Sequence, residues 1–128
     1  MKTNEHNGAG KLGEALRRLR KDKRLTQAQL ADAIGVDESY ISKIETGRLP
    51  YTPSEETLRL MAQTLGADSL ELLALAQKVP NELQSLAGSP SAREFFELIR
   101  QRSLKSNDWE DLTQMLRHRL DRRERGRR

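Results

Sequence analysis

The sequence predicts an all-α protein, and two observations support this prediction. Apolar residues recur at intervals of three and four along most of the chain, which is the period of an amphipathic helix, whereas the alternation typical of a strand is almost absent. Capping residues and glycines, such as Gly35 and Gly66, separate the helical stretches. We therefore expect a compact five-helix domain over residues 11–78, followed by a small helical region over residues 79–123.

A helix-turn-helix is the clearest local feature of the chain. Thr26 is a candidate N-cap for a helix over Gln27–Ile34, and Gly35 stands where a helix end needs a left-handed residue. Asp37 is the candidate cap of a second helix over Glu38–Thr46. In proteins with this pattern, the second helix enters the DNA major groove.

The other helices of the compact domain are indicated by their caps and apolar stripes. A first helix is expected over residues 11–23. Ser54 precedes a helix that ends at Leu65, and Asp68 with Glu71 forms a capping box for a fifth helix that ends near Lys78. The residues expected to be buried in the domain are Leu12, Ala15, Leu16, Leu19, Leu30, Ala31, Ile34, Ile41, Ile44, Leu58, Met61, Ala62 and Leu65.

This region resembles the Xre family, the Cro- and lambda-repressor-like DNA-binding domains of bacteria and phages. The residues that carry the resemblance are Leu25-Thr26-Gln27, Ala31 with Gly35, and the run from Tyr40 to Gly47. The resemblance covers about residues 11–76. It implies a five-helix fold and a transcriptional regulator that binds double-stranded DNA. Since one recognition helix reads only about 4–5 bases, too few for selectivity in a genome, we expect a dimeric repressor that reads an inverted-repeat operator.

The resemblance also assigns DNA contacts to individual residues. Gln27 matches a position that binds the phosphate backbone, whereas Glu38 and Ser39 match positions that read base edges. A carboxylate at Glu38 only accepts hydrogen bonds, so it suits the amino group of cytosine; the alternative is that Glu38 only stabilises the helix N-terminus, by ~0.3–1 kcal/mol. Lys43 suits guanine or a phosphate. The expected DNA-binding residues are Gln27, Asp37, Glu38, Ser39, Tyr40, Ser42, Lys43, Thr46 and Arg48.

Arg20 and Glu45 match a pair of positions that form an ion pair in the Xre family. The resemblance therefore gives Glu45 a structural role. It also implies that the backbone amides of Gly47 and Arg48 are exposed at the end of the recognition helix, where they meet DNA.

The region after Pro80 has a different composition. We expect a short helix over Asn81–Ala87, a break at residues 88–90, a helix that Ser91 caps and that ends near Leu104, and a last helix opened by a capping box of Asn107 and Glu110. The apolar stripe of this last helix is too narrow to form the core of a monomer, which favours dimerisation. The expected dimerisation residues are Phe95, Phe96, Ile99, Trp109, Leu112, Leu116 and Leu120.

Charge and composition narrow the possible functions. The net charge is +4, but residues 11–24 and 117–128 each carry seven Lys or Arg against two acidic residues, which fits a polyanionic partner. Cysteine is absent, no apolar run is long enough for a membrane span, and neither histidine has a partner at metal-ligand spacing. We expect a cytoplasmic, nucleoid-associated protein without enzymatic activity, metal or cofactor. Residues 1–10 are expected to be a flexible leader, residues 124–128 a basic tail, and residues 122–128 disordered.

Two alternative functions are also compatible with the sequence. The protein could be an antitoxin whose C-terminal helices bind a toxin, or a controller protein of a restriction-modification system. The segment Leu73–Leu86 also resembles Xre regulators of mobile elements and stress regulons, some of which work beside a regulatory metallopeptidase. A toxin or such a metallopeptidase is thus a possible partner.

Overall fold

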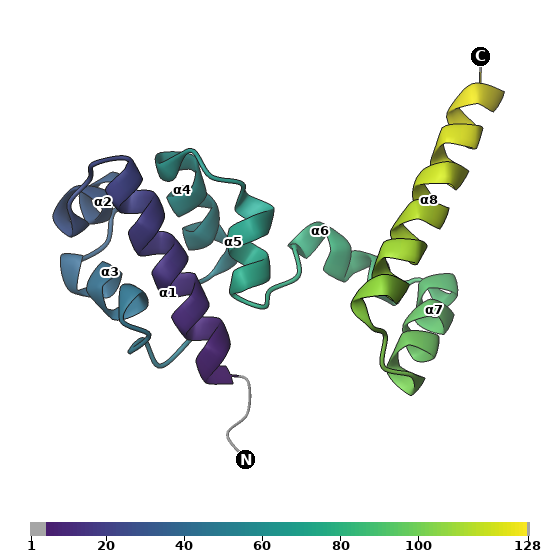
Figure 1. Ribbon diagram of the computed structural model, residues 1–128, viewed down its shortest axis with the longest axis horizontal. Helices are drawn as coiled ribbons and strands as arrows, with labels where there is room; N and C mark the ends of the chain where they lie inside the picture. The colour runs from purple at the N-terminus through teal and green to yellow at the C-terminus, as the bar shows by residue number, and fades with distance from the viewer. Residues whose placement is uncertain (1–4, 128) are drawn as a thin grey trace. The chain divides into compact units, whose positions relative to one another are not determined.

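The computed structural model describes residues 5–127 as helices and short connections, with no strand among these residues (Figure 1). The all-α prediction is confirmed. The chain divides into two compact units, with the boundary between Gln84 and Ser85. The first unit contains α1 (Glu5–Asp22), α2 (Gln27–Ile34), α3 (Glu38–Glu45), α4 (Glu55–Leu65), α5 (Ser69–Leu75) and α6 (Asn81–Gln84). The second contains the 3₁₀ helix η1 (Ser85–Gly88), α7 (Pro90–Gln101) and α8 (Ser106–Gly126).

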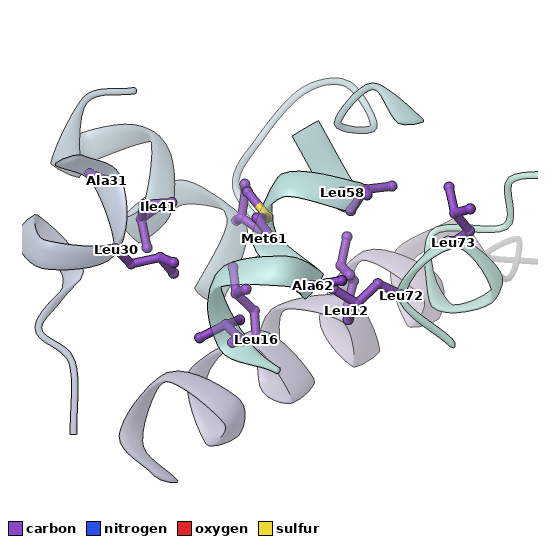
Figure 2. Close-up of a cluster of buried hydrophobic side chains, with 12 residues drawn as sticks. Leu12, Leu16, Leu30, Ala31, Ile41, Leu58, Met61, Ala62, Leu72 and Leu73 are labelled. Carbon is purple, nitrogen blue, oxygen red and sulfur yellow. The ribbon is translucent and has the colours of Figure 1, made fainter. Parts of the chain in front are cut away.

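The core of the first unit lies among α1 to α5 (Figure 2). Leu16, Leu30, Ile41, Leu58 and Met61 are completely buried, each at 0% exposure. Most of the residues expected inside are buried, whereas Leu19 and Ile34 are partly buried against the cluster. The apolar stripes of the sequence therefore identify the core of this unit correctly.

Two boundaries in the first unit differ from the prediction. Helix α1 begins at Glu5 rather than Lys11, so residues 5–10 are helical and the expectation of a flexible leader is wrong for them; residues 1–4 lie outside the described residues. Extending an existing helix adds one hydrogen bond for each residue fixed, and no proline interrupts this stretch. Helix α5 ends at Leu75, because Gln77 adopts a left-handed φ of 57° that an α-helix does not continue through.

The expected boundary between Lys78 and Val79 lies six residues before the division seen in the structure. The reason is that α6 packs with the first unit through the N-terminal turn of α4. The Asn81 amide donates to Glu55 Oε1 at 3.0 Å, and Arg59 Nη2 lies 3.3 Å from Glu82 Oε1. The predicted helix over Asn81–Ala87 is divided into α6 and η1.

The helices of the second unit also begin and end at other residues than predicted. Pro90, which we expected in a break, is the first residue of α7, where its missing N–H and fixed φ are favourable; the helix ends at Gln101 because Arg102 is extended. Helix α8 is capped two residues before the predicted box, because the Asp108 carboxylate accepts from the Lys105 amide at 2.9 Å.

The expectation of disorder over residues 122–128 is wrong for residues 122–126, which continue α8; Arg128 lies outside the described residues. Arginine is a good helix former, and cations near a helix C-terminus are favoured by the helix dipole. The basic end of the chain is therefore an ordered helical surface up to Gly126.

Candidate nucleic-acid interface

Helices α2 and α3 form the helix-turn-helix, and its turn has the predicted capping geometry. The Thr26 hydroxyl accepts from the Gln29 amide at 3.0 Å, while the Gln29 side chain accepts from the Thr26 amide at 2.8 Å. Gly35 ends α2 with a left-handed φ of 74°, and the Val36 amide donates to the Ala31 carbonyl at 3.0 Å. These bonds fix the direction in which the chain leaves α2 and enters α3.

Helix α3 has one buried and one exposed face. Ile41 and Ile44 are buried in the core, whereas Glu38, Ser39 and Lys43 are exposed on the opposite side. Ser42 is half-buried between the two faces. The exposed face thus presents a carboxylate, a hydroxyl and an ammonium group, which together can accept and donate hydrogen bonds to base edges or phosphates.

Asp37 occupies the N-cap position of α3, but its side chain forms no capping hydrogen bond. The prediction is right about the position and wrong about the side-chain bond. The Tyr40 amide donates instead to the backbone carbonyl of Asp37 at 3.0 Å, so the carboxylate is not needed for the cap. Asp37 and Glu38 together make the entry of α3 acidic, which disfavours phosphate at this end of the helix.

The position of α3 is fixed by an ion pair with α1. Arg20 donates from Nε and Nη2 to the two carboxylate oxygens of Glu45, at 2.8 and 2.9 Å. The side chains of Arg20 and Glu45 are only 10% and 2% exposed. The hydrogen bond to Glu45 raises the pKa of Arg20, although burial opposes this change. The geometry is that of a structural ion pair, the role expected for these residues.

Two further hydrogen bonds extend this ion pair to α2 and to the connection that precedes it. Arg20 Nη1 donates to the Leu25 carbonyl at 2.8 Å, and Gln27 Nε2 donates to Glu45 Oε1 at 3.3 Å. Glu45 therefore connects α1, α2 and α3. Gln27 is half-buried, and its side-chain amide supports the recognition helix whether or not it also binds a phosphate.

Gly13 was not singled out by the sequence, although it determines how closely α1 approaches α3. It is buried between Leu12 and Leu16 on the inner face of α1. A Cβ at this position would lie 2.7 Å from the Glu45 carbonyl oxygen and would also clash with the Ile44 carbonyl oxygen. A glycine on the buried face of a helical pattern was the available sequence signal for this close approach.

The end of α3 differs from what the resemblance implies. The Gly47 amide donates to the Ile44 carbonyl at 3.1 Å, and the Arg48 amide donates to the Lys43 carbonyl at 2.8 Å. The Thr46 hydroxyl donates to the Ser42 carbonyl at 2.9 Å. The amides that we expected to meet DNA are therefore already satisfied within the chain. The Arg48 side chain remains exposed and is the group at this end that suits a phosphate.

Tyr40 is half-buried against the core beside the loop that follows α3. Burial raises the pKa of Tyr40, nearby Tyr51 raises it further, and a hydrogen bond with Thr57 lowers it. A shallow groove beside this ring runs between α3 and the loop and is lined by Val36, Asp37, Ser39, Tyr40, Lys43, Leu49, Pro50 and Tyr51. The hydrogen bond directs the Tyr40 hydroxyl toward Thr57 of α4, and the spacing of the sequence did not indicate this contact.

Within residues 5–127, none of the helices has the length and apolar content of a membrane span. The same residues contain no group of three or more side chains arranged to hold a metal ion.

Comparisons with known proteins place this geometry in a family. A family model described as a helix-turn-helix domain matches residues 11–76. The chain is 41% identical to the ImmF control region 10 kDa protein of Bacillus phage phi105, over 45% of this chain and 62% of that protein. It is 32% identical to the uncharacterized HTH-type transcriptional regulator RghRB of Bacillus subtilis, over 79% of this chain and 79% of that protein.

A similar solved structure is the restriction-modification controller protein C.AhdI from Aeromonas hydrophila, with 34% identity, a TM-score of 0.46, and coverage of 50% of this chain and 94% of that one. The immunity repressor protein of phage phi105 is 40% identical over 43% of this chain. The chain spans 62% and 37% of the lengths of the two phage relatives.

The chain belongs to the helix-turn-helix domain family and to the class of helix-turn-helix transcriptional regulators. The resemblance to the Xre family is thereby confirmed.

Proposed function

We propose that this protein is a dimeric, cytoplasmic transcriptional repressor without enzymatic activity, which reads an inverted-repeat operator through α3. The observation that carries the proposal is the exposed set Glu38, Ser39 and Lys43 on a helix whose opposite face is buried. The Arg20–Glu45 ion pair holds this helix against α1, so the three side chains present a preorganised surface to the major groove.

Within this proposal, the other expected DNA contacts surround the base-reading residues. Gln27 at the start of α2 and Arg48 after α3 are placed on elements that flank the exposed face of α3, where cations and amides suit phosphates. Tyr40 and Ser42 are half-buried, and the exposed Thr46 hydroxyl donates to the Ser42 carbonyl of the same helix, which favours a supporting role for these residues.

Dimerisation through residues 79–123 completes the proposal. One recognition helix contacts only about 4–5 bases, which is too few for selectivity in a genome. The proposed dimerisation residues include Phe95 and Phe96 on α7, each 46% exposed, with ring centroids 5.9 Å apart in an edge-to-face pair. Trp109, Leu116 and Leu120 of α8 are 48%, 57% and 47% exposed, so apolar surface is available for a partner subunit.

An unbiased selection from random double-stranded DNA with the full-length protein tests the proposed function. We expect an enriched inverted repeat whose half-site centres lie about one helical turn apart, ~34 Å, or a multiple of that distance. Affinity for the selected site should fall steeply with salt, because phosphate contacts release counterions. Enrichment of no motif, or of a motif without twofold symmetry, would contradict the proposal.

A further inference from the structure

Helix α8 has an uneven distribution of charge along its length. Its first part carries Asp108, Glu110 and Asp111 without a cation, residues 112–116 are uncharged, and residues 117–126 carry five arginines against two acidic residues. Acidic residues at the N-terminal end and basic residues at the C-terminal end stabilise a helix through its dipole, but that effect is confined to the first and last turns. Arg117 and Arg119 lie more than a turn before Gly126, so the dipole does not explain them.

The apolar and charged residues of α8 are arranged about nearly the same point, which lies between residues 113 and 115. Leu112 and Leu116 lie symmetrically about residue 114, and Trp109 and Leu120 about a point half a residue further on. Two pairs of opposite charges, Asp108 with Arg119 and Glu110 with Arg117, are symmetric about a point between residues 113 and 114. A helix that packs against an antiparallel copy of itself needs this arrangement, because residue i then contacts residue j and j contacts i.

The four charged residues of these pairs also lie on the sides of the helix that an antiparallel pair requires. With 3.6 residues per turn, Glu110 and Arg117 lie on one flank of the apolar stripe, and Asp108 and Arg119 lie on the other. In an antiparallel pair each flank lies beside the same flank of the partner, so both flanks would join a carboxylate to a guanidinium. A parallel pair would instead place the acidic ends together and the arginines together, which is repulsive.

These side chains are free for such contacts in the described part of the chain. Glu110, Arg117 and Arg119 are exposed and take part in no ion pair within residues 5–127. Asp108 uses Oδ2 to accept from the Lys105 amide, which leaves its other oxygen for a partner. We infer that the surface of α8 formed by these four charges and the stripe Trp109, Leu112, Leu116 and Leu120 binds a second copy of α8 in antiparallel orientation. This inference rests on the proposed dimerisation.

Single cysteines test the orientation, because the full-length chain has no cysteine of its own. Thr113 and Glu124 are both exposed and lie on the same flank of α8. In the antiparallel pair, Thr113 lies within about one residue of the symmetry centre, so two copies are about 3 Å apart along the helix axis. Two copies of Glu124 would be about 30 Å apart along the axis at 1.5 Å per residue.

We expect full-length Thr113→Cys to form a disulfide-linked dimer on mild oxidation, and Glu124→Cys, as the matched control, to remain uncrosslinked. Crosslinking at both positions would indicate a parallel pair and overturn the inference. Absence of crosslinking at Thr113→Cys would also overturn it, because α8 then does not pair with itself at this centre. Sedimentation of the unoxidised variants separates the proposed dimerisation from the antiparallel pairing of α8. A dimer that does not crosslink contradicts only the antiparallel pairing, whereas a monomer contradicts both the dimerisation and the pairing.

Discussion

Arg20 of α1 donates two hydrogen bonds to the carboxylate of Glu45, the last residue of α3, at 2.8 and 2.9 Å. The Glu45 side chain is 2% exposed, and the same carboxylate accepts from Gln27 of α2. This carboxylate therefore determines how the recognition helix is held against the two helices that precede it.

Replacement of Glu45 by alanine should strongly destabilise the protein. The substitution leaves the buried Arg20 guanidinium without its partner, and breaking a buried ion pair in this way costs about 3–5 kcal/mol. Urea unfolding at fixed protein concentration measures the loss. Glu82→Ala is the matched control, because Glu82 is 72% exposed in its pair with Arg59 and should cost less than about 1 kcal/mol. Equal effects of the two substitutions would contradict a structural role for Glu45.

Gly13→Ala should destabilise the protein, contrary to the usual effect of alanine in a helix. Alanine is normally favoured over glycine by about 1 kcal/mol. Here the added methyl group would lie 2.7 Å from the Glu45 carbonyl oxygen, and overpacking costs typically ~1–3 kcal/mol. Gly10→Ala in the same helix is the control, because its Cβ would have no neighbour within 4 Å. Thermal unfolding should show Tm lowered by the first substitution and unchanged or raised by the second.

Tyr40 should titrate above the ordinary tyrosine pKa of 10.0, because burial disfavours its charged form. With the folded pKa above the unfolded pKa, the contribution of Tyr40 to stability is complete below about pH 10 and is lost as pH rises through the folded pKa. The difference in phenolate absorbance between the natural protein and Tyr40→Phe isolates this transition. A midpoint at or below 10.0 would show that the ring is not buried as described.

Trp109→Ala combined with Leu116→Ala should convert the full-length protein to a monomer. Complete burial of a side chain of this size contributes ~1.5–3 kcal/mol, but Trp109 and Leu116 are only 48% and 57% exposed in one chain, so each can contribute about half of that on dimerisation. A symmetric interface loses this contribution in both subunits, so the dimer should weaken by about a hundredfold or more. Analytical sedimentation over a concentration series measures this change. Leu70→Ala is the control, because Leu70 is as exposed as Leu116, at 57%, but lies on α5. A dimer that survives the double substitution would exclude the α8 stripe as the main interface.

The sequence predicted the helical core well because the burial pattern of an amphipathic helix is local. Leu30, Ile41 and Met61 could all be placed from their spacing. The close approach at Gly13 and the hydrogen bond of Tyr40 with Thr57 could not, because they depend on how separate helices pack. The ends of helices were also less predictable: Pro90 can stop one helix or begin another, and only the backbone around it decides which.

The central claim is that the exposed face of α3 reads base edges, and Glu38 tests it most directly. Glu38→Gln keeps the size of the side chain but adds a donor, so it can change base preference without removing volume. Parallel binding selections with the natural protein, Glu38→Gln and Arg48→Ala should be compared. We expect Glu38→Gln to change the preferred base at one equivalent position in both half-sites, by about 1–3 kcal/mol, while Arg48→Ala weakens all sites nearly equally and leaves the motif unchanged. An identical motif from the natural protein and Glu38→Gln would contradict the claim and leave Glu38 as a residue that only stabilises the start of α3.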